Sequence, residues 1–160
     1  MFDPTALLRP HLRDLVPYSS ARDDYQGEEG VFLDANENPL GSITKSSWNR
    51  YPDPYQVALK KRISEIKSVN WEHLFLGNGS DEPIDLLLRA FCEPQRDHII
   101  INPPTYGMYQ VSADINGVAV KKVLLTPNFE LDGDGILKAI DAQTKLIFIC
   151  SPNNPTGNDL

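Results

Sequence analysis

The sequence predicts an α/β domain: a mainly parallel sheet flanked by helices, preceded by an N-terminal arm. From Tyr51 onward, strand-like and helix-like segments alternate along the chain. Such alternation is typical of parallel sheets that helices cover on both faces. Residues 1–50 differ, because they are rich in Pro, Asn, Ser and Gly and show little sustained periodicity. We therefore expect an arm over residues 1–50 and the α/β domain over residues 51–160.

The first regular elements follow directly after the arm. Asp53 is expected to cap a helix that Pro54 starts. A short strand is then expected over residues 73–77, "HLFLG". The apolar stripe of this first helix consists of Leu59, Ile63 and Ile66.

The second helix begins at a capping Ser80 and ends before Pro94. A buried strand over 98–102, a helix over 106–115 closed by Asn116-Gly117, and a strand over 118–125 follow. The last elements are a short helix over 133–142 and a strand over 145–150. The stripe of the second helix consists of Ile84, Leu87, Leu88 and Phe91, at the spacing of one helix face.

Composition and charge exclude several classes of function. The 160 residues, 41% hydrophobic and 23% charged, are typical of one globular domain. A net charge of −7 disfavours nucleic acid and anionic membranes as partners. We see no signal peptide and no membrane span, and Cys92 and Cys150 lie too far apart in sequence for a metal motif. We expect a cytoplasmic protein with structural thiols and no metal site.

Three loops carry the polar residues that can form a site. They are "GNGSDE" (77–82), "NPPTYG" (102–107) and "SPNNPTG" (151–157), and each follows a predicted strand. Because ligands of parallel sheets bind at the carboxyl ends of the strands, we expect the three loops at one edge.

Each loop suggests a different contact to a ligand. Gly77, Gly79 and Ser80 form a glycine turn at a helix start, which suits a phosphate. Tyr106 can stack on a flat ring, and Asn154 can donate a hydrogen bond to a ring oxygen. Taken singly, each loop also fits an ordinary capped turn or a packing role. Together they indicate a pocket for a phosphorylated aromatic cofactor.

An ordered set of motifs resembles the histidinol-phosphate aminotransferase family, which belongs to the fold type I enzymes that use pyridoxal 5'-phosphate. "NPTG" alone would indicate only the wider superfamily. The motifs run along nearly the whole chain: "PYSSAR" (17–22), "LDANENPLG" (33–41), "RYPDP" (50–54), "GNGSDE" (77–82), "PPTYGMY" (103–109) and "SPNNPTGN" (151–158).

The resemblance implies the first, incomplete part of the large cofactor-binding domain over residues 51–160. It implies transfer of an amino group between glutamate and imidazole acetol phosphate, in histidine biosynthesis, by a cytoplasmic homodimer. The cofactor-binding residues it implies are Gly79, Ser80 and Asp81 at the phosphate, Tyr106 on the ring, Asn154 at the ring hydroxyl oxygen, and Tyr51 at the phosphate of the partner subunit. The implied substrate-binding residues are Tyr18, Asn36 and Asn38.

One departure from the family is large. Family members need a Schiff-base lysine, an acid on the pyridine nitrogen and a substrate-binding arginine, all located after "NPTG". Lys145 starts a strand at the opposite sheet edge, and Lys121 and Lys122 are expected in mid-strand, facing opposite sides. We therefore expect no catalytic residue in this chain, and no activity from the chain alone.

Three alternatives stay open. Threonine-phosphate decarboxylase shares the same loops. Another fold type I aminotransferase is a second alternative, of which aromatic aminotransferases are a weaker case. A non-catalytic interaction module is the alternative of a different class.

Overall fold

The structure is a computed structural model that describes residues 3–20, 30–46 and 48–160. The chain divides into two units. The first combines the N-terminal residues up to Leu15 with Gly77–Leu160, and the second is Val16–Leu76.

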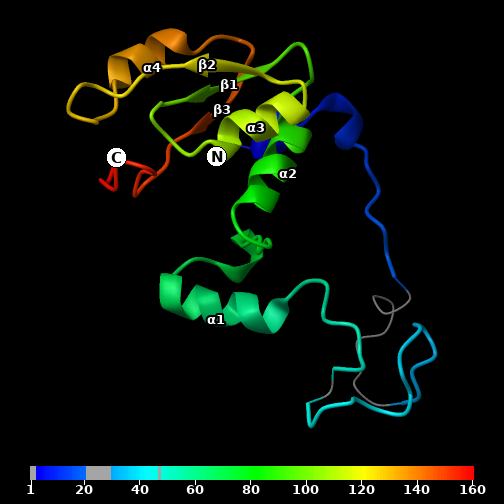
Figure 1. The fold of residues 1–160 in the computed structure, drawn as a ribbon. Coiled ribbons are helices and arrows are strands. Elements are labelled where there is room, and N and C mark those ends of the chain that lie inside the picture. Colours follow the sequence, from blue (N-terminus) through cyan, green and yellow to red (C-terminus); the bar gives the residue numbers. More distant parts are fainter. Residues whose placement is uncertain (1–2, 21–29, 47) are drawn as a thin grey trace. The chain divides into compact units, whose positions relative to one another are not determined.

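The first unit contains a three-stranded parallel sheet (Figure 1). The strands are β1 (His98–Ile101), β2 (Ala119–Lys122) and β3 (Thr144–Phe148), in the order β2-β1-β3. All four residues of β1 are buried, which fits the central strand of a parallel sheet covered on both faces. The expected α/β class with a parallel sheet is confirmed.

Helices cover this sheet on two sides. α2 (Asp81–Phe91) and α3 (Met108–Ile115) lie on one side, and α4 (Gly133–Ala139) lies on the other (Figure 1). Ile99 and Ile101 pack with α2 and α3, whereas Ile100 alternates to the opposite face and is also fully buried. The buried cluster consists of Ile84, Leu88, Cys92, Ile99, Ile101, Tyr109, Ala113 and Val118.

The helix stripes are only partly buried. On α2, Ile84 and Leu88 enter the core as expected, whereas Leu87 remains 39% exposed. Burial raises the pKa of the Cys92 thiol to about 11, which agrees with a packing role.

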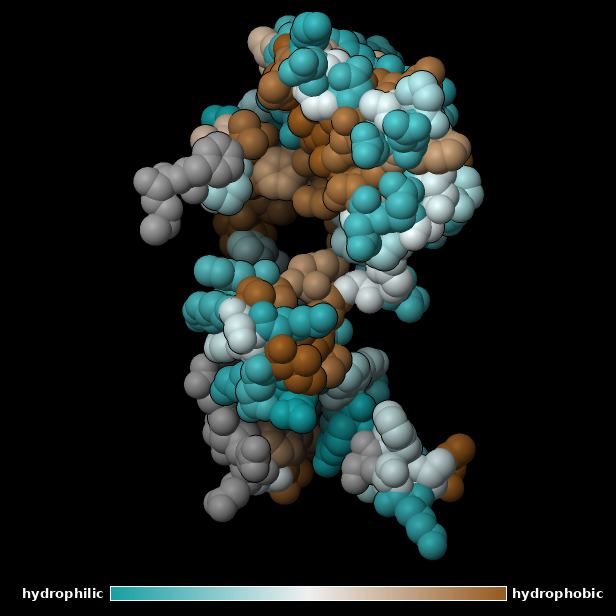
Figure 2. Space-filling view, turned by 90° about the vertical axis from the view of Figure 1, so that its left-hand side faces the viewer, coloured by the Kyte–Doolittle hydropathy of each residue, from teal (hydrophilic) through white to brown (hydrophobic). Residues whose placement is uncertain are grey.

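Apolar side chains also reach the surface, and Figure 2 shows brown areas between teal ones on the face that it displays. The buried cluster therefore contains only some of the apolar residues that the structure describes.

Two short 3-10 helices of the N-terminal segment belong to the first unit. They are η1 (Pro4–Leu7) and η2 (Pro10–Leu12). Between them, the amide of Arg9 donates to the carbonyl of Ala90 at 2.9 Å, and its guanidinium pairs with Glu93 at 3.2 Å. This part of the expected arm is thus tied to the end of α2 in its own chain.

The second unit holds α1 (Val57–Lys67) and η3 (Trp71–His73). The Asp53 carboxylate accepts from the amides of Tyr55 and Val57, at 2.9 and 2.8 Å. Gln56 is in the left-handed region, so the helix begins at Val57 and not at Pro54 as expected. The expected apolar stripe of α1, Leu59, Ile63 and Ile66, is not buried in a core, because no residue of α1 is buried.

The strand expected over residues 73–77 is wrong. The side chain of Asn70 accepts from the amide of Glu72, and the amide of Leu74 donates to the carbonyl of Trp71 at 3.1 Å. These local bonds form η3, and no described strand pairs with residues 74–77. An apolar run forms a strand only when a partner strand pairs with its backbone, and no described strand does so here.

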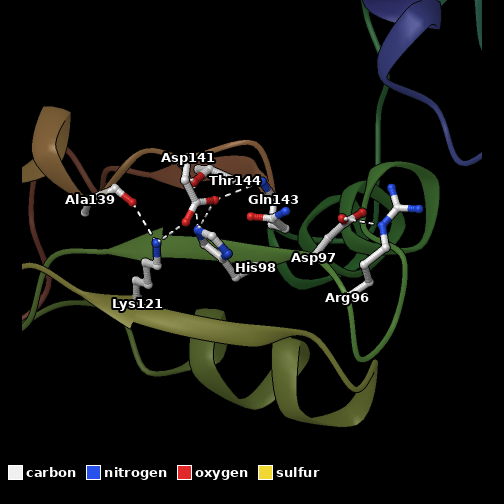
Figure 3. Close-up of polar contacts among 8 residues, drawn as sticks. All are labelled: Arg96, Asp97, His98, Lys121, Ala139, Asp141, Gln143 and Thr144. Carbon is white, nitrogen blue, oxygen red and sulfur yellow. Dashed lines mark hydrogen bonds and ion pairs between the residues drawn. The ribbon is translucent and has the colours of Figure 1, made fainter.

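A polar network lies at the amino ends of the strands, opposite the predicted site (Figure 3). Lys121 donates to Asp141 at 2.6 Å and to the carbonyl of Ala139 at 2.9 Å. The ring of buried His98 contacts the Thr144 hydroxyl at 2.7 Å. This arrangement lowers the pKa of Asp141, chiefly through the hydrogen bond from Lys121 and then through the amide of Gln143.

The first prediction concerns this network. Because the pKa of Asp141 in the folded state lies below its ordinary 3.8, Asp141 contributes stability at neutral pH, and this is lost as the pH falls through the folded-state pKa. Asp141→Asn should lower the urea midpoint at neutral pH and leave it unchanged in strong acid. The exposed Asp14→Asn is the control, and an equal effect of both variants at neutral pH would contradict the prediction.

Two negative findings apply to the described residues. No helix among them is long and apolar enough to cross a membrane. Across residues 3–20, 30–46 and 48–160, no group of three or more His, Cys, Asp or Glu side chains is arranged to hold a metal ion.

Candidate functional site

Two of the three loops meet at the carboxyl edge of the sheet. β1 and β3 are parallel neighbours, so the loops after Ile101 and Phe148 leave the sheet side by side. Thr105 donates to the side-chain oxygen of Asn153 at 3.2 Å, and the Asn153 amide group donates to the carbonyl of Pro104 at 3.0 Å. The expected clustering of these loops is confirmed.

Asn153 ties the two loops together. Its side chain also donates to Thr156 at 2.6 Å, and only 3% of the residue is exposed. Neighbouring Asn154 is exposed, and its side chain makes no hydrogen bond with the described residues. Sequence reasoning singled out Asn154 and missed the structural role of Asn153, although two adjacent amides in one tight turn indicate that one of them is used internally.

The third loop, before α2, presents free backbone donors. Gly79 has φ of +78°, a left-handed conformation that favours glycine, and a Cβ there would meet no atom within 4 Å. Within the described part of the chain, no hydrogen bond uses the amides of Gly79, Ser80 or Asp81 as donors. These amides stand at the positive end of the α2 dipole. The arrangement suits an anion such as a phosphate.

Two details of this turn differ from expectation. Ser80 occupies the N-cap position, but its hydroxyl makes no capping hydrogen bond. The Glu82 carboxylate instead reaches back to the amide of Asn78. The hydroxyl of Ser80 interacts with that of Tyr106, where it lowers the pKa of Tyr106 against the larger opposite effect of Asp81.

Tyr106 connects the loop after β1 with the start of α2. Its hydroxyl donates to Asp81 at 2.9 Å, and this bond is the main cause that raises the pKa of Tyr106. The Tyr106 ring meets Tyr109 edge-on, at 5.6 Å between centroids and 87° between planes. Tyr109 in turn stacks on Phe148 at 4.8 Å. All three predicted loops are thus linked at one sheet edge.

The remaining predicted site residues lie in the second unit. Tyr18 and Tyr51 are exposed. Asn36 lies in an irregular segment outside helices and strands. Asn38 stabilises a turn, because its side chain donates to the carbonyl of Gly41 at 2.8 Å and accepts from the amide of Leu40. Their roles toward substrate and cofactor stay predictions.

Comparison with known proteins identifies the family. A family model described as "Aminotransferase class I and II" matches residues 24–160. The chain belongs to the class I and II aminotransferases. Curated proteins named histidinol-phosphate aminotransferase are similar to it: that of Cytophaga hutchinsonii is 59% identical over 157 residues, and that of Bacteroides thetaiotaomicron is 59% identical over 155 residues.

These relatives are longer than the chain. The matches cover 98% and 96% of this aminotransferase chain, but 45% and 44% of the two relatives. The chain therefore spans a little under half the length of the curated proteins that it matches.

Solved aminotransferase structures share the fold. The histidinol-phosphate aminotransferase of Clostridium acetobutylicum matches with a TM-score of 0.58 and 31% identity, over 69% of this chain and 31% of its own. A Thermus thermophilus aspartate aminotransferase matches with a TM-score of 0.57 and 27% identity, over 64% and 28%.

Class I and II aminotransferases use pyridoxal phosphate, and the described residues fit part of that group. The free amides of Gly79, Ser80 and Asp81 match its phosphate in chemistry. The partly exposed Tyr106 ring and the exposed Asn154 amide suit a flat ring with a polar substituent. The fit therefore covers the phosphate and one side of the ring.

Proposed function

We propose that the chain forms part of a histidinol-phosphate aminotransferase, which transfers an amino group between glutamate and imidazole acetol phosphate in histidine biosynthesis. The names of the relatives at 59% identity support this substrate over that of other family members. The observation that carries the proposal is the meeting of the three loops at one sheet edge. We also propose that the protein acts in the cytoplasm as a homodimer.

Within that function, each loop has one task. When bound, pyridoxal phosphate supplies the electron-withdrawing ring on which amino-group transfer takes place. The amides of Gly79, Ser80 and Asp81 hold its phosphate, because they are unpaired at a helix N-terminus. Tyr106 lies on the ring, and Asn154 donates to the ring hydroxyl oxygen. Asn153 keeps Asn154 in place through its three side-chain hydrogen bonds.

The residues of the second unit have proposed roles as well. We propose that Tyr51 reaches the cofactor phosphate of the partner subunit. Tyr18, Asn36 and Asn38 are proposed to contact the substrate. The motifs "PYSSAR", "LDANENPLG" and "RYPDP" support these assignments.

We propose further that the lysine needed by the chemistry lies outside residues 1–160. Among the described lysines, Lys121 is engaged by Asp141 at the opposite edge, and Lys145 is the second residue of β3. Lys122 was expected in mid-strand, but it is the last residue of β2 and thus lies at the carboxyl edge. It is exposed, and β1 separates its strand from β3.

The experiment is borohydride reduction with pyridoxal phosphate, followed by peptide mapping and an assay of amino transfer from glutamate. The 160-residue chain should show only scattered labelling of surface lysines and no transfer. The longer protein that contains this chain should show one labelled lysine outside residues 1–160. Stoichiometric labelling of one lysine in the short chain, together with transfer, would falsify the lysine proposal. Lys122→Arg is the matched control, because Lys122 is the described lysine at the carboxyl edge.

A further inference from the structure

One hydrogen bond joins two of the loops in a way that the proposed function does not use. The Tyr106 hydroxyl donates to Oδ1 of Asp81 at 2.9 Å, although the two residues are 25 positions apart. Asp81 is the first residue of α2, and Tyr106 stands just before α3. The bond therefore fixes the ring relative to the turn with the free amides.

The Tyr106 ring is also held from the sheet side. Tyr109 meets it edge-on, and Tyr109 is itself stacked on Phe148 of β3, with 14° between the ring planes. Tyr109 is 8% exposed and belongs to the core. The ring thus has a packed neighbour at one side, and its hydroxyl is held chiefly by the hydrogen bond to Asp81.

The Asp81 side chain is otherwise unfavourable in this place. A carboxylate beside the free amides repels the phosphate that these amides attract. A hydrogen bond to the Tyr106 hydroxyl gives the carboxylate a partner and a fixed direction. Glu82, the next residue, is engaged differently, by the amide of Asn78.

We infer that Asp81 is a positioning residue with two tasks: its backbone amide faces the phosphate, and its side chain holds the Tyr106 ring in place for the pyridine ring. This inference rests on the proposed function, because it concerns the same site. It assigns the carboxylate to Tyr106 and not to the cofactor. The ring geometry is then set by the same turn that holds the phosphate.

The first test needs no cofactor. Ultraviolet pH titration of the tyrosines, with Tyr106→Phe used to assign Tyr106 by difference, should show a lowered Tyr106 pKa in Asp81→Ala. The reason is that the hydrogen bond to Asp81 is the main cause of its raised pKa. Glu82→Ala removes a neighbouring carboxylate with a different partner and should change this titration less. Equal changes in the two variants would overturn the assignment of the hydrogen bond.

The second test measures affinity for pyridoxal phosphate, and the circular dichroism of the bound cofactor, in the longer protein that contains this chain. Tyr106→Phe should weaken binding about 3- to 10-fold, since it removes one hydrogen bond. Asp81→Ala should change the dichroism in the same way but weaken binding less, because it also removes the charge that repels the phosphate. The double variant should lose no more than either single one. Asp81→Asn keeps the acceptor and lacks the charge, so it should bind at least as tightly as the parent.

The outcomes separate this inference from the proposed function. If the parent protein does not bind pyridoxal phosphate, the proposed function fails, and the inference, which rests on it, falls with it. If the parent binds but Asp81→Ala matches it in affinity and dichroism, only the positioning role is overturned. Additive losses in the double variant would overturn it as well. Should Asp81→Ala fail to fold, Asp81→Asn and Tyr106→Phe still give opposite expected results.

Discussion

Replacing Leu88 by alanine should lower the free energy of unfolding by about 2–5 kcal/mol. Leu88 is 0% exposed and lies in the cluster that joins α2 to β1 and α3. Truncation removes buried methyl groups and leaves a cavity that the central strand cannot fill, because all residues of β1 are already packed. Urea unfolding of the variant and the parent protein measures the difference.

Leu87 provides a matched control on the same helix. It has the same chemistry and the neighbouring position, but 39% of it is exposed. Leu87→Ala should therefore cost about 1 kcal/mol or less, since less apolar area returns to water. Similar losses at Leu87 and Leu88 would mean that the described face of α2 is not the one that packs on the sheet.

The two adjacent asparagines of the last loop should separate stability from cofactor binding. Asn153→Ala should lower the free energy of unfolding by about 1–3 kcal/mol, because it removes a buried side chain and the three hydrogen bonds that this side chain makes to half-buried Thr105 and Thr156 and to the exposed Pro104 carbonyl. Asn154→Ala should leave the unfolding free energy nearly unchanged, since the side chain is exposed. It should instead weaken binding of pyridoxal phosphate about 5- to 10-fold, by the loss of one hydrogen bond.

Urea unfolding without cofactor, and titration with pyridoxal phosphate, give the two measurements for each variant. Asn153→Asp is a further control, because it keeps the acceptor for Thr105 and loses the donors to Pro104 and Thr156. At neutral pH it should be at most as stable as Asn153→Ala, because it also places a buried carboxylate against the Pro104 carbonyl oxygen. A large loss of stability in Asn154→Ala would contradict the assignment of separate roles.

Local patterns in the sequence were sufficient for most of the α/β unit. The run of three isoleucines in β1 strongly favours a buried strand. The apolar spacing of Ile84 and Leu88 predicts which face of α2 is buried. The meeting of the loops after β1 and β3 followed from parallel topology, whereas the loop 77–82 follows no described strand and is linked to them by the bond between Tyr106 and Asp81. These features depend on short-range periodicity and on one general rule of sheets.

The errors arose where a local pattern had two solutions. Residues 73–77 carry a short apolar run like that of a strand, but Asn70 begins a 3-10 turn that takes up His73, and no described strand pairs with the residues after it. Asp53 does cap, but Gln56 in the left-handed region moves the helix start to Val57. The choice between Asn153 and Asn154 depends on which side chain faces Pro104, a contact 49 residues away that no local pattern contains.

The strand order β2-β1-β3 has a consequence for biosynthesis. The central strand is made first, and its first neighbour, β2, is complete by Lys122. The bond between Tyr106 and Asp81 can therefore form early on the ribosome, whereas Asn153 arrives only after β3 has been added to the far side of β1. Pairing of His98 with Thr144 spans a long loop, and closing such loops slows folding. The phosphate turn and the aromatic ring should thus be assembled during translation before the asparagine loop completes that edge.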